Sequence, residues 1–423
     1  MTLSEELEWR GFINQTTFKD IKELDDKQWT FYHGFDASAP SQAVGNLAAM
    51  MFDKVFMRHG HKAILLAGGA TSLIGDPGGK DSERVLQDEQ TIAQNVAYAE
   101  EQLKKILGEG KFTLVNNLDW TKDMKVLDFL RDIGKHFSMT PLVQRDYIAK
   151  RLGEGGSGIS YTEFSYTLLQ GMDFLHLYDT FGATLQLGGA DQWGNCLSGV
   201  ELIRRARGAE AHVITLPLVI NKATGKKFGK SEEGAVWLDV SRTSVYKFYQ
   251  FWLNSDDESV EGYLKIFTEL DKPKIEQVMR DFNNNRASRI AQKTLAFEVT
   301  KLVHGEDQAR KQVRIAEAVA SQTLQGLDDA EVAVLRDEMP HAEAQPGYEV
   351  SDVLLQAGLA SSKTEARRFV AENAVSINGQ KSQKERLEED DFINGRLLIR
   401  RGKAFKDSAV VERSQALIKS LKL

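Results

Sequence analysis

The regular alternation of strand-like and helix-like segments in the first half of this chain is the feature that most restricts its fold. Residues 30–35 and the apolar run KAILLAGG (62–69) have the character of strands, the run being continuous enough for burial on both sheet faces. Residues 46–58, which Gly60 would end, and residues 87–107 predict helices. KFTLVNN, ATLQLGG and HVITLPLVI predict three more strands. The alternation predicts an α/β fold, with a doubly wound, Rossmann-like parallel-sheet domain at 1–239.

Helical patterns replace the strand patterns after this domain. SVYKFYQFWLN, SVEGYLKIFTEL, KPKIEQVMRDF and ASRIAQKTLAFEVTKLVHG predict an all-helical domain at 240–321, with Gly305 ending its last long helix. The acidic segment 322–347 is expected to be a loop-rich linker.

A small α+β domain is predicted at 348–423. Two short helices precede VSINGQKS, which predicts a hairpin with Asn378-Gly379 at its turn. RLLIRRGKAF predicts a second strand pair, and residues 405–423 predict a terminal helix to which we assign no role.

Composition narrows the class of protein. The chain has one cysteine, Cys196, so we expect neither an internal disulfide nor a thiolate zinc cluster. It has no run of ~18 apolar residues that would predict a membrane helix, and its first residues lack the basic and apolar segments of a secretory signal. We therefore expect a cytoplasmic protein without a membrane partner.

Charge is distributed unevenly along the chain. The net charge of −7 argues against a general nucleic-acid coat, and we expect no DNA partner. Residues 348–423 carry 14 Lys and Arg against 11 Asp and Glu, an excess of +3, which leaves −10 for the rest. A basic tail on an acidic body is typical of an RNA-binding domain, although so small an excess is equally compatible with chance.

Three glycine-rich stretches predict ligand-binding loops. In FYHGFDASAPSQAVGNLAAMM (31–51) a strand, a loop and a helix start meet, which suits phosphate because free backbone N–H groups lie at the positive helix end. In LLAGGATSLIGDPGGKDSER (65–84) and LQLGGADQWGN (185–195) a strand ends in two glycines followed by polar residues. Such glycines let a ligand approach the backbone at the carboxyl edge of the sheet, and ordinary turn glycines are the alternative.

Two groups of side chains could bind a polar ligand. Tyr166, Gln170 and Asp173 are spaced by four and three, so they share one helix face, either exposed to solvent or lining a polar pocket. The lysines of GKKFGKS (225–231) lie between glycines in a polar loop. That loop could close over a polyphosphate, or it could be an exposed basic loop.

Taken together, these segments resemble the bacterial tyrosyl-tRNA synthetases, which are class I aminoacyl-tRNA synthetases. The matching stretches, in the family's order, are YHGFDAS, LAGGATSLIGDP, FLRDIGKHFSM, ISYTEFSYTLLQGMDFL, LQLGGADQWGN and KFGKSEEGAVW. The similarity extends to about residue 404 and is strongest over 30–90 and 159–240. Residues 348–404 resemble the alpha-L RNA-binding fold found at the C-terminus of these synthetases, which favours RNA as the partner of the tail.

The resemblance implies a tyrosine–tRNA ligase that works in two steps. The tyrosine carboxylate attacks the α-phosphorus of ATP and releases pyrophosphate, and the 3′-terminal ribose of tRNA(Tyr) then takes the tyrosyl group. Neither step needs a protein nucleophile, so catalysis would rest on positioning and charge stabilisation. Mg²⁺ would accompany the ATP without a dedicated protein cage, so we expect no metal-ligating residues.

The resemblance also implies the site residues. Tyr32 and Asp173 would hold the phenol hydroxyl of tyrosine, and Gln192 would lie by its carboxylate. The ammonium group has three N–H donors and needs acceptors. The acceptors implied are Asp76, Tyr166 and Gln170.

For ATP, the residues implied either line the ribose and α-phosphate or grip the pyrophosphate. The first set is Gly34, Asp36, Ser38, Gly45, Asn46, Gly189 and Asp191. The catalytic set is Asn46 with four basic residues from two loops, Lys80, Arg84, Lys227 and Lys230, of which the two lysines of the second loop also count as ATP-binding.

The resemblance further implies RNA contacts and a homodimer. Lys363, Arg367 and Arg368 lie on one helix face and could contact phosphate, or could be ordinary solvated charges. The interface would lie near residues 110–160, where VLDFLRDIGKHFSMTPL (126–142) resembles that of the family. Its apolar side chains would suit a core nearly as well; they are Leu127, Phe129, Leu130 and Phe137.

One signature of the family is broken in this chain. The family's H-x-G-H motif falls on Ala43-Val44-Gly45-Asn46. Asn46 can still donate from its amide, but Ala43 cannot, and losing one donor to a developing charge typically costs ~3 kcal/mol, or ~10²–10³ in rate. Gln42 or Ser38 could replace part of that contact, and His33 could either reach the ribose or only pack.

Two other functions remain open on the sequence alone. The missing histidine would suit a non-catalytic RNA-binding protein on a synthetase scaffold. An enzyme that adenylates an amino acid for another acceptor is the second alternative, against which the C-terminal RNA-binding resemblance argues.

Overall fold

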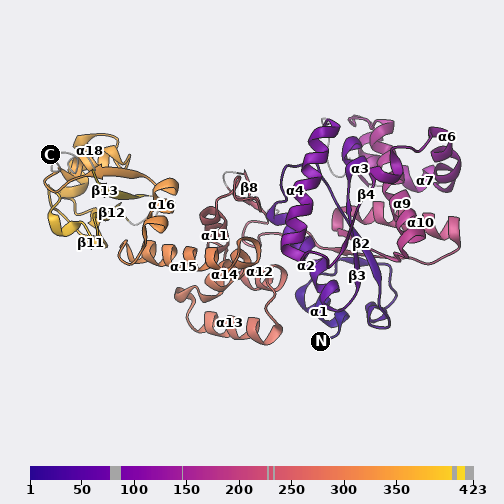
Figure 1. Cartoon of the computed structure of the whole chain (residues 1–423), viewed down its shortest axis with the longest axis horizontal. Coiled ribbons are helices and arrows are strands. Elements are labelled where there is room, and N and C mark those ends of the chain that lie inside the picture. The colour runs from indigo at the N-terminus through magenta and orange to yellow at the C-terminus, as the bar shows by residue number, and fades with distance from the viewer. Residues whose placement is uncertain (77–86, 145, 226–227, 232–233, 403–406, 415–423) are drawn as a thin grey trace. The chain divides into compact units, whose positions relative to one another are not determined.

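A computed structural model describes residues 1–76, 87–144, 146–225, 228–231, 234–402 and 407–414. It divides into two compact units, Met1–Val303 and His304–Leu423, which we describe in turn (Figure 1). The first unit holds the residues of the predicted α/β domain and most of the helices predicted after it. Helix α15 (Glu306–Ser321), which we had grouped with those helices, belongs to the second unit.

The described part of the first unit is built on a six-stranded sheet in the order β1-β6-β5-β2-β3-β4. Neighbouring strands are parallel except β1 and β6. The chain moves outward from β2 to β4 and then returns to β5 on the other side of β2, so the strand order reverses between β2 and β5. The predicted doubly wound sheet is confirmed, and this reversal is where such sheets bind ligands. The strands are β1 (Gln15–Thr16), β2 (Thr30–Phe35), β3 (Lys62–Ala67), β4 (Thr113–Asn116), β5 (Leu185–Gly189) and β6 (His212–Leu216).

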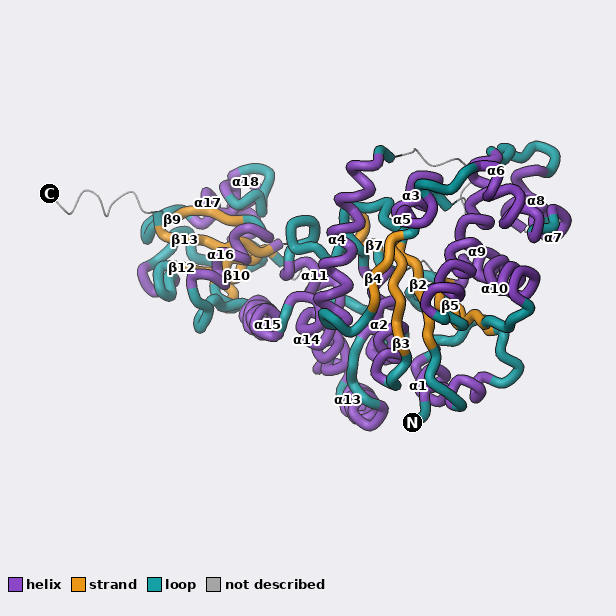
Figure 2. The backbone as a smooth tube through the Cα atoms, turned by 45° about the vertical axis from the view of Figure 1, so that its right-hand side comes forward, coloured by secondary structure: helices purple, strands orange, loops and turns teal. Residues whose placement is uncertain are grey.

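Helices cover both faces of this sheet (Figure 2). Helices α2 (Val44–Arg58) and α4 (Glu89–Leu107) pack on one face, and α9 (Tyr161–Phe181) and α10 (Trp193–Arg207) pack on the other. The ring of Phe31 lies 5.3 Å from that of Phe56 on α2, whereas the ring of Tyr32 lies 4.9 Å from that of Phe174 on α9. Because strand side chains alternate, His33 points to the α2 side.

Shorter elements complete the first unit. Those within the α/β part are α1 (Leu3–Arg10), α3 (Gly69–Ile74), α5 (Leu118–Thr121), α6 (Val126–Asp128), a π-helix (Phe129–Ile133), α7 (Met139–Val143), α8 (Asp146–Leu152) and 3-10 turns at Ile21–Asp25, Gly134–His136 and Ala190–Gln192. The hairpin of β7 (Lys230–Ser231) and β8 (Gly234–Ala235) follows β6. The helical part then comprises α11 (Val245–Leu253), α12 (Val260–Phe267), α13 (Lys272–Asn284), a 3-10 turn (Arg286–Ser288) and α14 (Ile290–His304).

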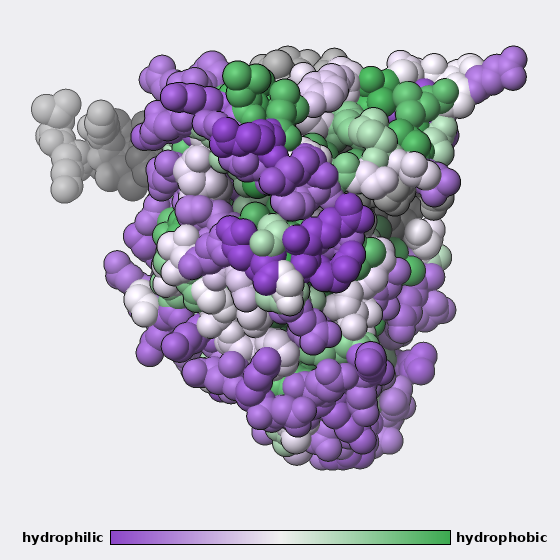
Figure 3. Space-filling model, turned by 90° about the vertical axis from the view of Figure 1, so that its right-hand side faces the viewer, coloured by the Kyte–Doolittle hydropathy of each residue, from purple (hydrophilic) through white to green (hydrophobic). Residues whose placement is uncertain are grey.

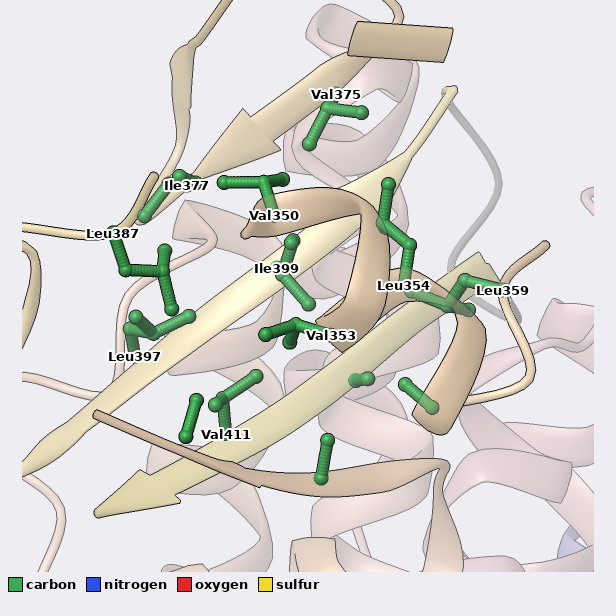
Figure 4. Close-up of a cluster of buried hydrophobic side chains, with 14 of the residues drawn as sticks. Val350, Val353, Leu354, Leu359, Val375, Ile377, Leu387, Leu397, Ile399 and Val411 are labelled. Atoms are coloured by element: carbon green, nitrogen blue, oxygen red, sulfur yellow. The ribbon is translucent and has the colours of Figure 1, made fainter. Parts of the chain in front are cut away.

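The described residues of the second unit form a five-stranded sheet in the order β11-β10-β12-β13-β9, with β13 and β9 parallel and the other neighbours antiparallel. Val353 and Leu354 pack with Ile399 and Val411 in its core (Figure 4). Asn378 and Gly379 have φ of +46° and +80°, as the predicted hairpin turn requires. The other elements are α16 (Asp329–Glu338), β9 (His341–Ala344), α17 (Val350–Gln356), α18 (Lys363–Ala371), β10 (Val375–Ile377), β11 (Gln380–Lys381), a 3-10 turn (Glu389–Asp391), β12 (Arg396–Arg401) and β13 (Ser408–Arg413).

Two predictions for this unit are wrong. The predicted linker 322–347 contains α16 and β9, whose apolar residues, such as Leu335 and Ala344, are buried. The predicted terminal helix 405–423 contains β13 at Ser408–Arg413, so the partner of β12 is not within RLLIRRGKAF. Residues 415–423 lie outside the described residues.

Candidate active site

A cavity of about 530 Å³ lies at the carboxyl ends of β2, β3, β5 and β6, where the strand order reverses. Its walls bring together all six residues predicted to bind tyrosine. They also contain every residue predicted at the ribose and α-phosphate except Ser38. Residues from four strand ends, α2 and α9 therefore meet in one site.

Polar atoms without partners face this cavity at one end. Among the described residues, the buried Tyr32 Oη, Gln170 Oε1 and Gln186 Oε1 have no hydrogen-bond partner. Burial raises the pKa of Tyr32, so its hydroxyl keeps its proton. Since buried polar atoms are nearly always paired, this end is built for a polar ligand. Gln186, on β5, was not predicted because it lies inside an apolar strand pattern.

Asp173 is held by two donors that the sequence analysis missed. Its carboxylate accepts from Asn117 Nδ2 and from Trp120 Nε1, each at 2.9 Å. Burial raises the pKa of Asp173 to about 7, and these two hydrogen bonds oppose the rise. Asn117 and Trp120 follow β4 at the carboxyl edge of the sheet, the only sequence signal that could have suggested them.

A chain of hydrogen bonds fixes the carboxylate of Asp76. Thr167 Oγ1 donates to Asn195 Oδ1 at 2.8 Å, and Asn195 Nδ2 donates to Gln192 Oε1 at 3.2 Å. Gln192 Nε2 then donates to Asp76 Oδ2 at 2.6 Å. Asp76 is thereby joined to α9 through two side chains of the glycine-rich segment after β5, and it enters the cavity as an oriented acceptor.

The other end of the cavity is made largely of backbone and the start of α2. Ala43 is the N-cap of α2 and supplies no side-chain hydrogen bond. Its N–H donates to Asn46 Oδ1 at 3.1 Å, so the remaining amide atom of Asn46 is the donor Nδ2. The first N–H groups of a helix lack helical partners and attract anions. In the described chain Val44 N–H donates to Val236 O, and the N–H groups of Asn46 and Leu47 donate to Ala43 O. This end can therefore offer a phosphate the N–H of Gly45 and the Nδ2 of Asn46.

The GKKFGKS segment is held against this helix start by its described residues. The ring of Phe228 lies 4.3 Å from that of Tyr263 and 5.0 Å from that of Phe251 in the helical part. Gly229 has φ +103°, and a Cβ there would lie 3.3 Å from the backbone N of Gly45. The segment can approach α2 this closely only with a glycine.

The other predicted ATP residues are distributed as follows. Lys80, Arg84 and Lys227 lie outside the described residues, and Lys230 is described only by its backbone in β7. Ser38 donates to Asp36 from its N–H and its hydroxyl, each at 2.9 Å, and does not line the cavity. Gln42 is 2% exposed and also stays out of the cavity. Neither of these two polar residues faces the place left open by Ala43.

The predicted RNA contacts on α18 form ion pairs with neighbouring acids. Lys363 lies 2.8 Å from Asp352, Arg367 lies 3.3 Å from Glu349, and Arg368 lies 3.8 Å from Glu365. All three basic side chains remain well exposed. They are open to a polyanion, which would have to compete with these carboxylates.

Apolar side chains are exposed over α6 and α7. The fractional exposure is 73% for Val126, 79% for Leu127, 45% for Leu130 and 59% for Met139. Figure 3 views the side of the molecule on which these helices lie, and hydrophobic residues gather near its top. Phe129 and Phe137 instead pack in the core beside α9, so the predicted interface segment is partly core.

None of the helices in the described ranges has the length and apolar character that crossing a membrane requires. The same ranges contain no group of three or more His, Cys, Asp or Glu side chains arranged to hold a metal ion.

Comparisons with known proteins agree with this geometry. The family model for class I tRNA synthetases (W and Y) matches residues 24–320, and the model for the tyrosine–tRNA ligase SYY-like C-terminal domain matches residues 331–405. The second match begins inside the segment that we predicted as a linker.

Close relatives cover nearly the whole chain. A tyrosine–tRNA ligase of Bacillus caldotenax is 44% identical over 414 residues, which are 95% of this chain and 98% of that protein. One of Staphylococcus carnosus is 44% identical over 411 residues, with 95% and 97% covered.

Solved structures show the same architecture. A C-terminally truncated mitochondrial tyrosyl-tRNA synthetase of Aspergillus nidulans has a TM-score of 0.67 at 31% identity and covers 75% of this chain and 94% of its own. The tyrosyl-tRNA synthetase of Archaeoglobus fulgidus, at 15% identity and a TM-score of 0.54, shares the fold. With these matches and a cavity that gathers the predicted tyrosine-binding residues, the chain belongs to the class I tyrosine–tRNA ligases.

Proposed function

We propose that this cavity activates L-tyrosine with ATP and passes the tyrosyl group to the 3′ end of tRNA(Tyr). The observation that carries the proposal is that Tyr32 Oη, buried without a hydrogen-bond partner among the described residues, and the buried carboxylate of Asp173 line the same cavity. A phenol hydroxyl can donate to Asp173 and accept from Tyr32. Phenylalanine would leave Tyr32 Oη unpaired and would not donate to Asp173, whose buried carboxylate accepts from only Asn117 and Trp120, so the site rejects it strongly.

The amino-acid head group would lie between α9 and the glycine-rich segment after β5. Gln170 Oε1 is an acceptor without a partner in the described residues, and Asp76 is an oriented anion, so the two suit an ammonium group together with Tyr166. Gln192 would then lie beside the tyrosine carboxylate.

ATP would occupy the other end of the cavity. The N–H of Gly45 and the Nδ2 of Asn46 would face the α-phosphate, and Asp36 and Asp191 would accept from ribose hydroxyls, beside Gly34 and Gly189. Lys80, Arg84, Lys227 and Lys230 would neutralise the pyrophosphate.

The reaction follows from this placement. A tyrosine carboxylate oxygen forms a bond to the α-phosphorus while the bond to the pyrophosphate oxygen breaks. A terminal ribose hydroxyl of the tRNA then attacks the tyrosyl carbonyl carbon, and AMP leaves. Mg²⁺ bound to the ATP phosphates would help to neutralise the leaving group, with water and phosphate oxygens as its ligands.

Three further parts of the proposal concern partners and location. The exposed apolar residues over α6 and α7, continuous with the core beside α9, support a homodimer with a second copy of this chain. The exposed cations of α18 support tRNA contact by the second unit. Because the 44% identical relatives come from bacteria, where translation is cytoplasmic, we place the activity in the cytoplasm.

Tyrosine-dependent exchange of pyrophosphate into ATP tests the first step, and charging of tRNA tests the second. We expect exchange with tyrosine and none above background with phenylalanine at the same concentration. Absence of exchange at high enzyme concentration would support the non-catalytic alternative. Exchange without tRNA charging would support an adenylating enzyme with another acceptor.

A further inference from the structure

Rings of the helical part hold the GKKFGKS segment from outside the cavity. The ring of Phe228 lies 4.3 Å from that of Tyr263 on α12. Three more ring centroids lie within 5.5 Å of it, those of Phe251, Trp252 and Phe267. We call these four rings, Tyr263 included, the aromatic box. Aromatic pairs of this kind add ~0.5–1.5 kcal/mol to the energy of burial, so the box fixes Phe228 firmly.

Two hydrogen bonds tie the chain before this segment to the same helix. Tyr263 Oη donates to Ile220 O at 3.3 Å, and Lys222 N–H donates to Ser259 Oγ at 2.9 Å. Burial raises the pKa of Tyr263, so its hydroxyl keeps the proton that it donates. Helix α12 therefore holds the chain at residues 220–222 and again at Phe228.

The start of α12 is arranged so that a serine hydroxyl is free to make one of these bonds. Asp256 Oδ1 accepts from Ser259 N–H at 2.7 Å, which satisfies an N–H group of the first helical turn. The hydroxyl of Ser259 is therefore not needed as a cap. Its residue is only 1% exposed, and the hydroxyl accepts from Lys222 instead.

The other end of α12 is fixed to the α/β part. Arg10 on α1 is 4% exposed and donates at 2.5, 3.0 and 2.9 Å to three backbone carbonyls at this end, those of Lys265, Thr268 and Leu270. Arg10 also pairs with Glu6, which in turn pairs with Arg58 at the end of α2. Because α12 is tied to α2 in this way, it is a rigid support for a segment that packs on it.

A short series of backbone hydrogen bonds joins the supported segment to the start of α2. Gly229 O accepts from Val236 N–H at 3.2 Å, and Val236 O accepts from Val44 N–H at 2.9 Å. Lys230 follows Gly229, and its backbone pairs with β8. The backbone that carries Lys230 is thus held between the aromatic box and the helix whose start should meet the α-phosphate.

We propose that Tyr263 is a positioning residue for adenylate formation, which acts through Phe228 and Ile220 to set the place from which Lys230 meets the pyrophosphate. The proposal rests on the role proposed above for Lys230. Tyr263 is not among the described residues that line the cavity, so it has no ligand to touch. A displacement of ~1 Å caused far from the chemistry can cost ~10²-fold in rate, so the chemical step should depend on this support.

A double-mutant cycle between Tyr263 and Lys230 tests this inference. Tyr263→Leu removes the ring and the hydroxyl but keeps an apolar side chain in the box. We expect it to slow adenylate formation by ~10–10²-fold in the wild-type background. In the Lys230→Ala background the same change should cost less than about 3-fold, because the group that Tyr263 positions is then absent.

Two milder variants keep the test sharp if Tyr263→Leu does not fold. Ser259→Ala removes only the acceptor for Lys222 N–H, so it should slow adenylate formation by about 3–10-fold, and only while Lys230 is present. Tyr263→Phe keeps the ring and loses one long hydrogen bond, so its rate should stay within about 3-fold of wild type.

Phe282→Leu is the matched control for loss of a buried ring. Phe282 lies on α13 of the same helical part, is 1% exposed and does not belong to the aromatic box. Thermal unfolding should show a similar loss of stability in Phe282→Leu and Tyr263→Leu, while the rate of Phe282→Leu should stay within about 2-fold of wild type. Tyrosine affinity should be unchanged in Tyr263→Leu, since the residues proposed to bind tyrosine lie elsewhere in the cavity.

The outcomes distinguish failure of the inference from failure of the proposed function. If Tyr263→Leu costs the same in both Lys230 backgrounds, the inference is overturned and the proposed function stands. An equal rate loss in Phe282→Leu also overturns it, as does a folded Tyr263→Leu protein within about 3-fold of the wild-type rate. If the wild type forms no adenylate at all, the proposed function fails and the inference fails with it.

Discussion

The two ends of the cavity, which we name the tyrosine end and the ATP end after the ligands proposed for them, are built in different ways. At the tyrosine end, side chains make the site, and a hydrogen-bond network fixes them, as for Asp173 with Asn117 and Trp120. At the ATP end, glycine backbone and the start of α2 dominate, and Asn46 is the one polar residue of the signature motif that remains. A site made of a few fixed side chains loses much of its binding when one is removed. A site whose contacts are shared among backbone groups, Asn46 and the proposed basic loops can lose one side chain and keep its chemistry.

The largest expected effect comes from the basic loop at the ATP end. Replacing Lys227 and Lys230 together by alanine should reduce the rate of adenylate formation by at least ~10³, because the two cations that we propose neutralise the leaving group would be lost. Tyrosine affinity should change by less than about 2-fold, which equilibrium titration can measure. A matching loss of tyrosine affinity would show that the two ends are not separable.

The next effect belongs to the tyrosine end. Asp173→Asn keeps the shape but replaces an ionised acceptor, so kcat/KM for tyrosine should fall by ~10–100-fold, the usual range for a hydrogen bond to a charged group. The KM for ATP should stay constant. Steady-state pyrophosphate exchange measured at varied tyrosine and varied ATP concentrations checks this. A larger change in the KM for ATP than in kcat/KM for tyrosine would show that Asp173 does not belong to the tyrosine end alone.

We expect a fall in pH to weaken ligand binding only at the tyrosine end of the cavity. Because burial raises the pKa of Asp173 to about 7, this carboxyl is increasingly protonated below pH 7 and cannot accept from the phenol hydroxyl as a carboxylate does. Tyrosine affinity should therefore rise with pH and level off above pH 7, changing by up to about 10-fold per unit on the acid side. Titration of Asp173→Asn should show no such dependence, and an identical pH profile in that variant would assign the effect to another group.

The contact between the GKKFGKS segment and α2 should have a smaller effect. Gly229→Ala places a Cβ in a backbone region that costs of order 1–3 kcal/mol, close to Gly45, so we expect the activation rate to fall by about 10-fold. Gly225→Ala is the matched control, since Gly225 also has positive φ but has nothing within 4 Å of the added Cβ. Equal losses in both variants would assign the effect to loop strain rather than to the approach to α2.

The smallest effect is expected outside the cavity. Replacing Lys363, Arg367 and Arg368 by alanine should raise the KM for tRNA several-fold at low salt and reduce its salt dependence, because fewer counterions are released. Pyrophosphate exchange should not change. A tRNA KM that is the same at every salt concentration would remove α18 from the RNA-binding surface.

The sequence predicted the sheet and the position of the cavity better than it predicted the hydrogen bonds at either end of the cavity. Strand β3 is a buried apolar run apart from its first residue, so its pattern alone identifies it. β13 was mistaken for a helix because it is a short strand whose burial depends on pairing with β12 and β9. Likewise, Asn117 and Asp173 are 56 residues apart and His33 and Asp53 are 20 apart. Hydrogen bonds between distant residues leave no periodicity in a single sequence, and only the fold reveals them.

The most direct test of this account is a single-turnover measurement of tyrosyl-adenylate formed by the wild-type chain, with tyrosine affinity measured on the same preparation. The account predicts tight, phenylalanine-excluding tyrosine binding together with adenylate formation in every active site, despite Ala43. Tyrosine binding of that kind without any adenylate would contradict it, because it would mean that the ATP end cannot function with the donors that this chain retains.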